Sequence, residues 1–337
     1  MRILGIETSC DETCAAVVED GRRVLSNVVA TQVEIHRKYG GVVPEIASRA
    51  HLEAMVPVVA EALAGADLGA AEVDAVAAVH RPGLIGSLLL GVTAAKTIAW
   101  LHAKPLVAIN HVESHIYAPC LERERLPFPC VSLIVSGGHT SLYYSEGPSA
   151  HTLLGATTDD AAGEAFDKVA SLLDLPYPGG PSIDSVAARG RPDAVKFSRP
   201  WLAADSLDFS FSGLKTAVLY HVRGHGPGVK DRRPHLSEQE LADVCASFQE
   251  CVVDVLVGKA LRAAERKGVD AIMVGGGVAA NRRLRKRLEE ETARLGLELY
   301  MPPMKYCTDN AAMVAGLAWH YARAGQFADL GFEARAY

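Results

Sequence analysis

The stretch that begins the chain, RILGIETSCDETCAAVVE (residues 2–19), predicts a β-hairpin. Two apolar runs, 2–7 and 14–19, flank a polar turn, and a third run follows at 23–30, which is the pattern of a small meander. The same design returns downstream, where runs at 131–136 and 140–145 flank Gly137-Gly138-His139 and another run follows at 151–155. A unit that begins with a hairpin is therefore expected twice.

Helices and short strands are expected to alternate after each meander. In the first half, helices are predicted at 44–63, 84–101 and from His111, with strands at 75–79 and near Val107. In the second half, helices are predicted at 163–173, 182–189, 237–267, 278–295 and from Asp309, with strands at 271–274 and 297–300. Two α/β halves of similar order indicate a duplication. The expected lobes are 1–129 and 130–337, with an insertion near 192–235, and a ligand is expected in the cleft between them.

The composition is that of an ordinary globular protein, with 337 residues, 49% hydrophobic and 22% charged. Seven cysteines without a CxxC pair fit reduced thiols. No apolar run is long enough to span a membrane and no signal segment is evident, so a soluble, cytoplasmic protein is expected. The net charge of −6 does not favour nucleic acid as a partner of the whole surface. Local patches of basic residues could still bind nucleic acid: one on a predicted helix (Arg282, Arg283, Arg285, Lys286 and Arg287) and one in a polar loop (Lys230, Arg232 and Arg233). The alternative is a solvated helix face balanced by the acids at 289–291.

His111 and His115 are four residues apart at the start of a predicted helix, so both imidazoles project from one face. The pair lacks the glutamate of an HExxH metalloprotease motif. Asp309 begins the last helix as His111 begins its own. If the two halves face each other, one carboxylate and two imidazoles converge, a ligand set that suits Fe(II) or Zn(II). The alternative is that Asp309 is only a helix cap.

The two hairpin turns are candidates for binding phosphate, because small residues let backbone N–H groups approach an anion. One turn offers Thr8 and Ser9, and the other offers residues 136–138. The glycines at 275–277 match a loose dinucleotide-binding pattern, but too little chain follows to complete such a fold. We expect instead a loop close to a base or ribose, with Asn281 as a polar contact. Since helix N-termini favour anions, a phosphate-bearing ligand is expected to accompany the metal.

Six motifs in order resemble the TsaD family, the bacterial branch of a universal family once called O-sialoglycoprotein endopeptidases. They are residues 5–13 (GIETSCDET), 111–115 (HVESH), 134–140 (IVSGGHT), 209–215 (FSFSGLK), 275–281 (GGGVAAN) and 308–310 (TDN). The resemblance covers nearly the whole chain. It departs from the family at residues 81–84, where Arg81 stands in place of the first glycine of Gly-Pro-Gly-Leu.

The resemblance implies an actin-like fold and transfer of a threonylcarbamoyl group from threonylcarbamoyl-AMP to N6 of adenine 37 in tRNAs reading codons that begin with A, with release of AMP. It implies His111, His115 and Asp309 as ligands of one metal ion per subunit, usually iron. The residues implied to bind the adenylate are Ile134, Val135, Ser136, Gly137, Gly138, Asp167, Gly180, Asp184 and Asn281. The expected partners are TsaB and TsaE, besides the tRNA anticodon loop.

The nucleophile N6 of adenine must lose a proton during the transfer, so a base is required. His139, Asp11 and Glu12 are the candidates. Two other classes of function compete with the transferase: a metalloprotease, which the missing HExxH glutamate disfavours, and a non-enzymatic, nucleotide-gated scaffold of actin type.

Overall fold

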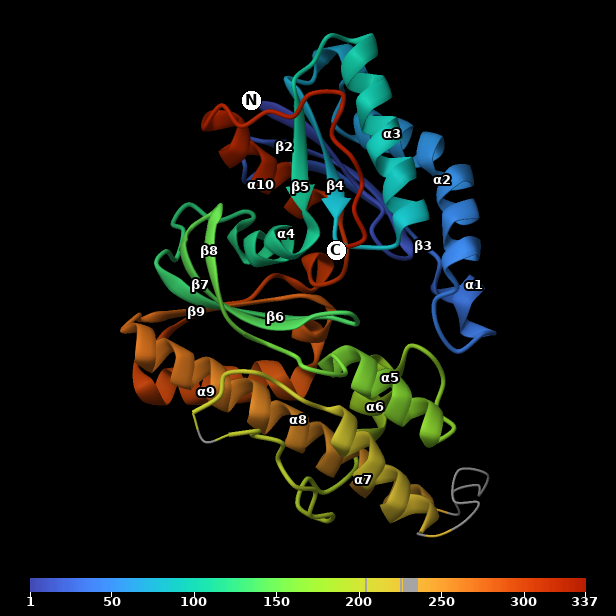
Figure 1. Ribbon diagram of the computed structural model, residues 1–337, viewed down its shortest axis with the longest axis vertical. Coiled ribbons are helices and arrows are strands. Elements are labelled where there is room, and N and C mark those ends of the chain that lie inside the picture. Colours follow the sequence, from blue (N-terminus) through green and yellow to red (C-terminus); the bar gives the residue numbers. More distant parts are fainter. Residues whose placement is uncertain (204, 225, 227–235) are drawn as a thin grey trace. The chain divides into compact units, whose positions relative to one another are not determined.

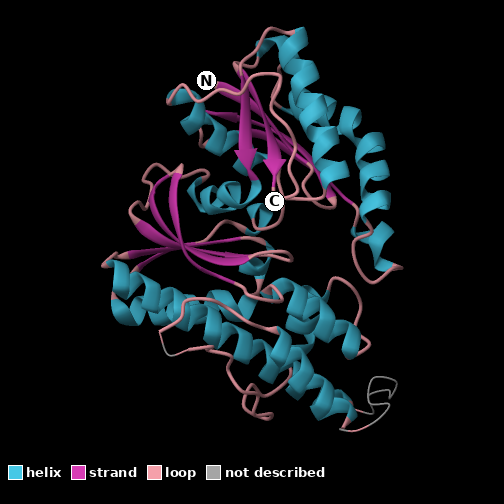
Figure 2. Ribbon diagram, in the orientation of Figure 1, coloured by secondary structure: helices cyan, strands magenta, loops and turns pink. Residues whose placement is uncertain are grey.

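The computed structural model describes residues 1–203, 205–224, 226 and 236–337. These residues form two compact units, which Figures 1 and 2 show as ribbons. The first unit comprises Met1–Phe128, Gly147–Ala150 and Pro302–Tyr337, and the second comprises Pro129–Glu146 and His151–Met301. The predicted boundary after residue 129 is close to the observed one. The assignment of the last segment to the second lobe is wrong, because Pro302–Tyr337 packs with the first unit.

The first unit is built on a five-stranded sheet of order β3-β2-β1-β4-β5. Its strands are β1 (Arg2–Glu7), β2 (Glu12–Glu19), β3 (Arg23–Thr31), β4 (Ala75–Arg81) and β5 (Leu106–Asn110), and its helices are α1 (Val33–Arg37), α2 (Pro44–Gly65), α3 (Ile85–Leu101), α4 (His111–Tyr117) and α10 (Ala311–Arg323). β1 pairs antiparallel with β2 and parallel with β4. The meander and the strand–helix alternation predicted for the first half are confirmed.

Both faces of this sheet are covered. Leu4 and Ile6 of β1 share one apolar cluster with Met55 of α2 and Ala99 of α3. Gly5 points to the other face and lies under α10, where a Cβ would come within 2.6 Å of the carbonyl oxygen of Ala311. The missing side chain therefore lets α10 lie directly on β1, and this contact returns the end of the chain to the first unit.

The second unit repeats the pattern in a sheet of order β10-β9-β6-β7-β8. Its strands are β6 (Cys130–Val135), β7 (Thr140–Gly147), β8 (Ala150–Ala156), β9 (Ala271–Gly275) and β10 (Glu298–Tyr300), and its helices are α5 (Ala162–Leu172), α6 (Gly179–Ala187), α7 (Ser212–Arg223), α8 (Glu238–Lys267) and α9 (Arg282–Leu295). β6 pairs antiparallel with β7 and parallel with β9, as β1 does with β2 and β4. The predicted duplication is confirmed.

Two predictions about the second unit need correction. The helix predicted from residue 278 begins at Arg282, because Gly277–Ala280 forms a 3-10 turn and the Asn281 side chain caps α9 by accepting from Leu284 N. The predicted insertion near 192–235 contains α7, which was not predicted. Residues 204, 225 and 227–235 of that insertion lie outside the described part of the chain. Among the described helices, none is both long enough and apolar enough for a membrane span.

Candidate functional site

The two histidines of α4 lie side by side, as their spacing predicts. Asn110 caps the helix by accepting hydrogen bonds from the backbone N–H groups of Val112 and Glu113, so α4 begins at His111 directly after β5. The rings of His111 and His115 are buried, and their centroids are 4.6 Å apart. A local cap and the helical repeat are therefore sufficient to bring the two imidazoles together.

Asp309 reaches both rings from the turn before α10. Its Oδ1 lies 3.0 Å from Nε2 of His115 and 3.8 Å from Nε2 of His111. One ligand atom from each of the three residues lies within 4.8 Å of the others. The predicted convergence is confirmed, but not its predicted cause. All three residues belong to the first unit, because the chain returns to that unit before Asp309.

The donor set fits a divalent transition metal. Nitrogen and oxygen ligands bind such an ion at about 2.0–2.2 Å, so two ligand atoms of one ion lie at most about 4.4 Å apart. Asp309 Oδ1 lies within this limit of both Nε2 atoms, at 3.0 Å from His115 and 3.8 Å from His111. Burial lowers the pKa of His111, but the carboxylates of Glu7 and Asp309 outweigh burial and raise the pKa to about 9. This negative surrounding favours a cation beside the imidazoles.

Glu7 was not predicted from the sequence as a site residue, and its carboxylate is a hydrogen-bond partner of His111. It ends β1, is fully buried, and accepts a hydrogen bond from His111 Nδ1 at 2.8 Å. Its other oxygen accepts from the backbone N–H of Ser9, whose hydroxyl lies 3.0 Å from the same Nδ1. Glu7 could have been predicted as a site residue because it ends β1. β1, β4 and β5 are parallel, so Glu7 and the start of α4 share the carboxyl edge of the sheet.

Two of the candidate proton acceptors, Asp11 and Glu12, lie near the cluster of two histidines and Asp309. Burial raises the pKa of Glu12 well above its ordinary value, and the nearby carboxylates of Asp309 and Asp11 add to the shift. The third candidate, His139, belongs to the second unit. There it closes the β6–β7 turn, with its N–H donating to Ser136 Oγ at 3.0 Å and its carbonyl accepting from Ser136 N at 2.8 Å.

The residues implied to bind the adenylate all belong to the second unit, and the first group lies at the end of β6. Ile134 and Val135 are buried in the strand, and Ser136 follows at its carboxyl end. Gly137 and Gly138 form the turn, and a Cβ at either position would meet no atom within 4 Å. The backbone of this turn is therefore open to a ligand, as the sequence predicts for a phosphate-binding turn.

The second group lies on α5 and α6. Asp167 accepts a hydrogen bond from Gly179 N at 2.7 Å, which ties the start of α6 to α5. Gly180 and Asp184 follow one helical turn apart on α6. The carboxylate of Asp184 accepts from Arg282 Nε at 2.6 Å, so α6 is linked in turn to the start of α9.

Asn281 completes this chain of contacts. Its Oδ1 accepts from Leu284 N at 3.0 Å, and its Nδ2 donates to Gln249 Oε1 at 2.7 Å. The loop before it passes close to β6, since a Cβ on Gly276 would lie 2.4 Å from the carbonyl oxygen of Val135. In this structure the side chain of Asn281 fixes the start of α9, and its contact with a base or ribose stays a prediction.

The basic residues of α9 are largely neutralised by acids. Arg283 donates two hydrogen bonds to Glu250. Other pairs in this region are Arg282 with Asp184, Lys286 with Glu290 and Arg287 with Glu291. The alternative of a solvated, charge-balanced helix face is therefore favoured over a nucleic-acid patch on α9.

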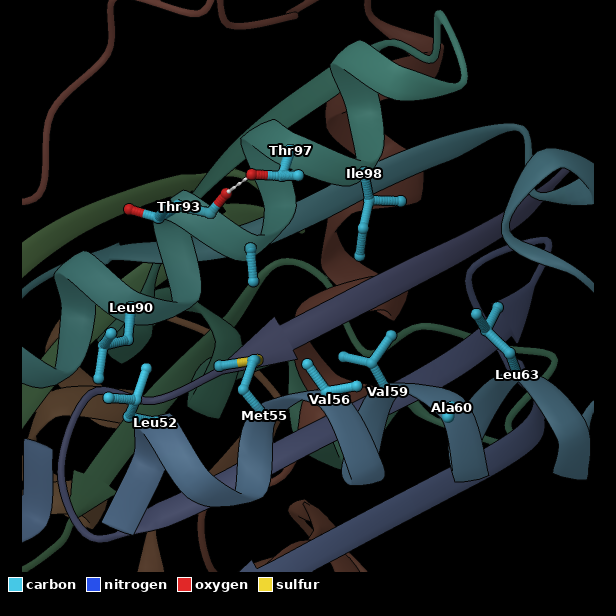
Figure 3. Close-up of a pocket in the computed structure, with 11 residues that line it drawn as sticks. Leu52, Met55, Val56, Val59, Ala60, Leu63, Leu90, Thr93, Thr97 and Ile98 are labelled. Atoms are coloured by element: carbon cyan, nitrogen blue, oxygen red, sulfur yellow. Dashed lines mark hydrogen bonds between the residues drawn. The ribbon is translucent and has the colours of Figure 1, made fainter. Parts of the chain in front are cut away.

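An apolar groove of about 460 Å³ runs between α2 and α3 in the first unit (Figure 3). Leu52, Met55, Val56, Val59 and Leu63 line it from α2, and Leu90, Thr93, Ala94, Thr97 and Ile98 line it from α3. Leu52 and Val56 remain 66% and 75% exposed. A row of exposed apolar side chains over two neighbouring helices is typical of a protein-binding surface.

Known proteins match this chain closely. The family model described as "TsaD: tRNA N6-adenosine threonylcarbamoyltransferase" matches residues 23–316. A protein of that name from Syntrophobacter fumaroxidans is 55% identical over 95% of this chain and 94% of its own length. Another from Moorella thermoacetica is 51% identical over 98% of this chain and 95% of its own length.

Solved structures resemble the chain in fold alone. HypF from T. kodakarensis has a TM-score of 0.63 at 15% identity, over 96% of this chain and 48% of that one. Component A of the Acidaminococcus fermentans (R)-2-hydroxyglutaryl-CoA dehydratase has a TM-score of 0.55 at 16% identity, over 96% and 99%. With the repeated sheets, these likenesses confirm the actin-like fold class. The long, close sequence match settles the family: the chain belongs to the TsaD family of tRNA N6-adenosine threonylcarbamoyltransferases.

Proposed function

We propose that the chain transfers the threonylcarbamoyl group of threonylcarbamoyl-AMP to N6 of adenine 37 in tRNAs that read codons beginning with A. The product is N6-threonylcarbamoyladenosine, and AMP is released. The observation that carries this proposal is the match of 51–55% identity, over nearly the whole chain, to transferases of this name. An actin-like fold by itself would not distinguish the transferase from a nucleotide-gated scaffold.

We infer that His111, His115 and Asp309 hold one Fe(2+), or Zn(2+), per subunit. The proximity of their ligand atoms and the surrounding carboxylates support this assignment. When bound, such an ion would supply a Lewis acid for phosphate or carbamoyl oxygens. The orientation of the two imidazoles is fixed by the protein itself, because both are buried on one short helix that Asn110 caps.

The nine residues at the end of β6, on α5 and α6 and at the start of α9 are proposed to bind the adenylate. The open backbone at Gly137 and Gly138 suits the phosphate. Asp184 is suited to the ribose, because a carboxylate can accept from sugar hydroxyls. Held in this way, the carbamoyl carbon needs mainly to be positioned for attack, since AMP already activates it as a leaving group.

In the transfer, N6 of adenine forms a bond to the carbamoyl carbon, and the bond from that carbon to the phosphate oxygen breaks. AMP leaves with the bonding electrons, and N6 gives its proton to a base. Asp11, Glu12 and His139 are the proposed acceptors. The target adenine lies in the anticodon loop, where an unpaired base can be turned outward to reach such a site.

TsaB and TsaE are proposed as protein partners, and the cytoplasm, where tRNA is found, as the location. The groove between α2 and α3 supports a helical partner, because it offers an apolar strip that α2 and α3 line from both sides. Such a partner would also supply surface for the tRNA, whose phosphates the net charge of this chain does not attract.

The test is mass spectrometry of tRNA nucleosides after incubation of the chain with threonylcarbamoyl-AMP, tRNA, ATP and the partner proteins. N6-threonylcarbamoyladenosine should form with the parent chain and be lost with His111→Ala. Full modification by His111→Ala would refute the proposed metal site. Absence of product from the parent in the presence of all partners, with ATP still changing partner affinity, would favour the scaffold.

A further inference from the structure

The buried carboxylate of Glu7 connects a proposed metal ligand, His111, to the first hairpin turn at Ser9. One oxygen holds His111 Nδ1 and the other holds the backbone N–H of Ser9. Glu7 itself is fully buried, and the whole arrangement lies within the first unit. A buried carboxylate costs considerable free energy unless charge or hydrogen bonds compensate it, so a purely structural link would be made more cheaply by a neutral side chain.

We propose that Glu7 is the positioning residue of the metal site, and that it does so by fixing the tautomer of His111. A carboxylate only accepts hydrogen bonds, so the proton of a neutral His111 must sit on Nδ1. Nε2, which faces Asp309 at 3.8 Å, then presents its lone pair to the site. Carboxylates that orient metal-binding histidines in this way also raise the basicity of the ring. This inference rests on the proposed metal site.

The same carboxylate couples the metal ligand to the first hairpin turn. The Ser9 N–H that it accepts belongs to the turn predicted to contact phosphate, and the Ser9 hydroxyl lies 3.0 Å from His111 Nδ1. Gly83 packs directly against this turn, since a Cβ there would lie 2.5 Å from the carbonyl oxygen of Ser9. Ring and turn are therefore held together by the Glu7 carboxylate and by the Ser9 hydroxyl.

The isosteric variant Glu7→Gln tests this role. A glutamine can offer its oxygen to only one of the two N–H groups. If its NH₂ faces His111, it donates to Nδ1 and forces the proton onto Nε2, where it blocks the ligand position. If its NH₂ faces Ser9, two donors meet. Either arrangement should weaken metal binding by about 10- to 100-fold, without removing any metal ligand.

The measurement is titration of the purified, metal-free full chain with Co(2+) as a spectroscopic probe, and with Zn(2+) by calorimetry. Glu113→Gln is the matched control. Glu113 lies on the same helix, where its carboxylate accepts from the Tyr321 hydroxyl, and it is not one of the three residues whose ligand atoms converge. We expect one ion per chain in parent and control, and the same stoichiometry at lower affinity, with an altered Co(2+) absorption spectrum, in Glu7→Gln.

The outcomes separate the two proposals. If the parent binds no ion at His111, His115 and Asp309, the metal site itself fails. If the parent binds one ion and Glu7→Gln binds it with the same affinity and spectrum, the metal site stands and the role of Glu7 is refuted. If Glu7→Gln proves too unstable to titrate, Glu7→Asp is the second variant. It keeps the charge but cannot span both partners, so it should also lower the metal affinity, by less than Glu7→Gln. An unchanged affinity in Glu7→Asp would then overturn the inference.

Discussion

The groove between α2 and α3 yields the prediction with the clearest magnitude. Leu52 and Val56 of α2 are 66% and 75% exposed, although both line the groove (Figure 3). If TsaB covers them, most of each side chain passes from water into an apolar interface. Full burial of such a side chain contributes about 1.5–3 kcal/mol, so these exposed fractions correspond to about 1–2 kcal/mol each.

The double variant Leu52→Ala, Val56→Ala should therefore weaken TsaB binding by about 2–4 kcal/mol, or roughly 30- to 850-fold in Kd. Calorimetry or sedimentation with purified TsaB measures this change. The fold should be unaffected, since both side chains project outward, and the thermal unfolding midpoint checks this. Leu153→Ala is the matched control, because Leu153 is 55% exposed on β8 of the second unit and lies outside the groove.

Two results would contradict binding of TsaB at the groove between α2 and α3. A change in Kd of less than about threefold in the double variant would mean that TsaB does not cover the groove. An equal loss in Leu153→Ala would mean that the effect comes from general surface apolarity and not from this pair of helices.

Three further predictions follow. Asp309→Ala should abolish stoichiometric metal binding and tRNA modification while the far-UV circular dichroism stays unchanged; retained metal, measured by mass spectrometry of the purified chain, would exclude Asp309 as a ligand. Gly5→Ala should lower stability by about 1–3 kcal/mol, because the new Cβ would lie 2.6 Å from the carbonyl oxygen of Ala311, whereas Gly65→Ala meets only an ordinary 3.4 Å contact and should change denaturant unfolding little. Partial burial raises the pKa of Asp159, but hydrogen bonds from the residues that begin α7 outweigh burial and lower it. Its contribution to stability, roughly 1 kcal/mol or less, is therefore present above the unfolded pKa of about 3.9 and is lost as pH falls through the lower folded value. The stabilities of the parent and Asp159→Asn should converge in acid, and a constant difference from pH 7 to pH 3 would contradict this.

Most strands could be predicted because their signals are local. β1 matches the predicted 2–7 run fully, since its apolar residues are bounded by a polar turn. The start of α9 was mispredicted by four residues, although Asn281 carried the capping signal, because the preceding glycines and alanines continue a helix-like run into the 3-10 turn. α7 escaped prediction because its N-cap, Phe211, makes no side-chain capping bond.

The site divides in the same way between local and distant causes. The histidine pair follows from helical spacing and a local cap, and both are readable in the sequence. The position of Asp309 depends on the return of α10 to β1, which requires the absent side chain of Gly5, some 300 positions away in the chain. The pairing of Arg283 with Glu250 is also distant, so the basic run on α9 looked more available for nucleic acid than it is.

The distribution of charge explains why this edge of the first sheet should carry a cation. Glu7 and Asp309 both act on His111, while Asp309 and Asp11 act on Glu12, and all of these groups are largely withdrawn from water. Within the described part of the chain, hydrogen bonds from Ser9 N–H and His111 Nδ1 compensate the charge of Glu7. A divalent ion held by the two imidazoles and Asp309 would add to that compensation and would connect α4 to the turn before α10. Because the ion would bind only where these segments are assembled, its binding free energy would stabilise the folded first unit as well as prepare it for the transfer.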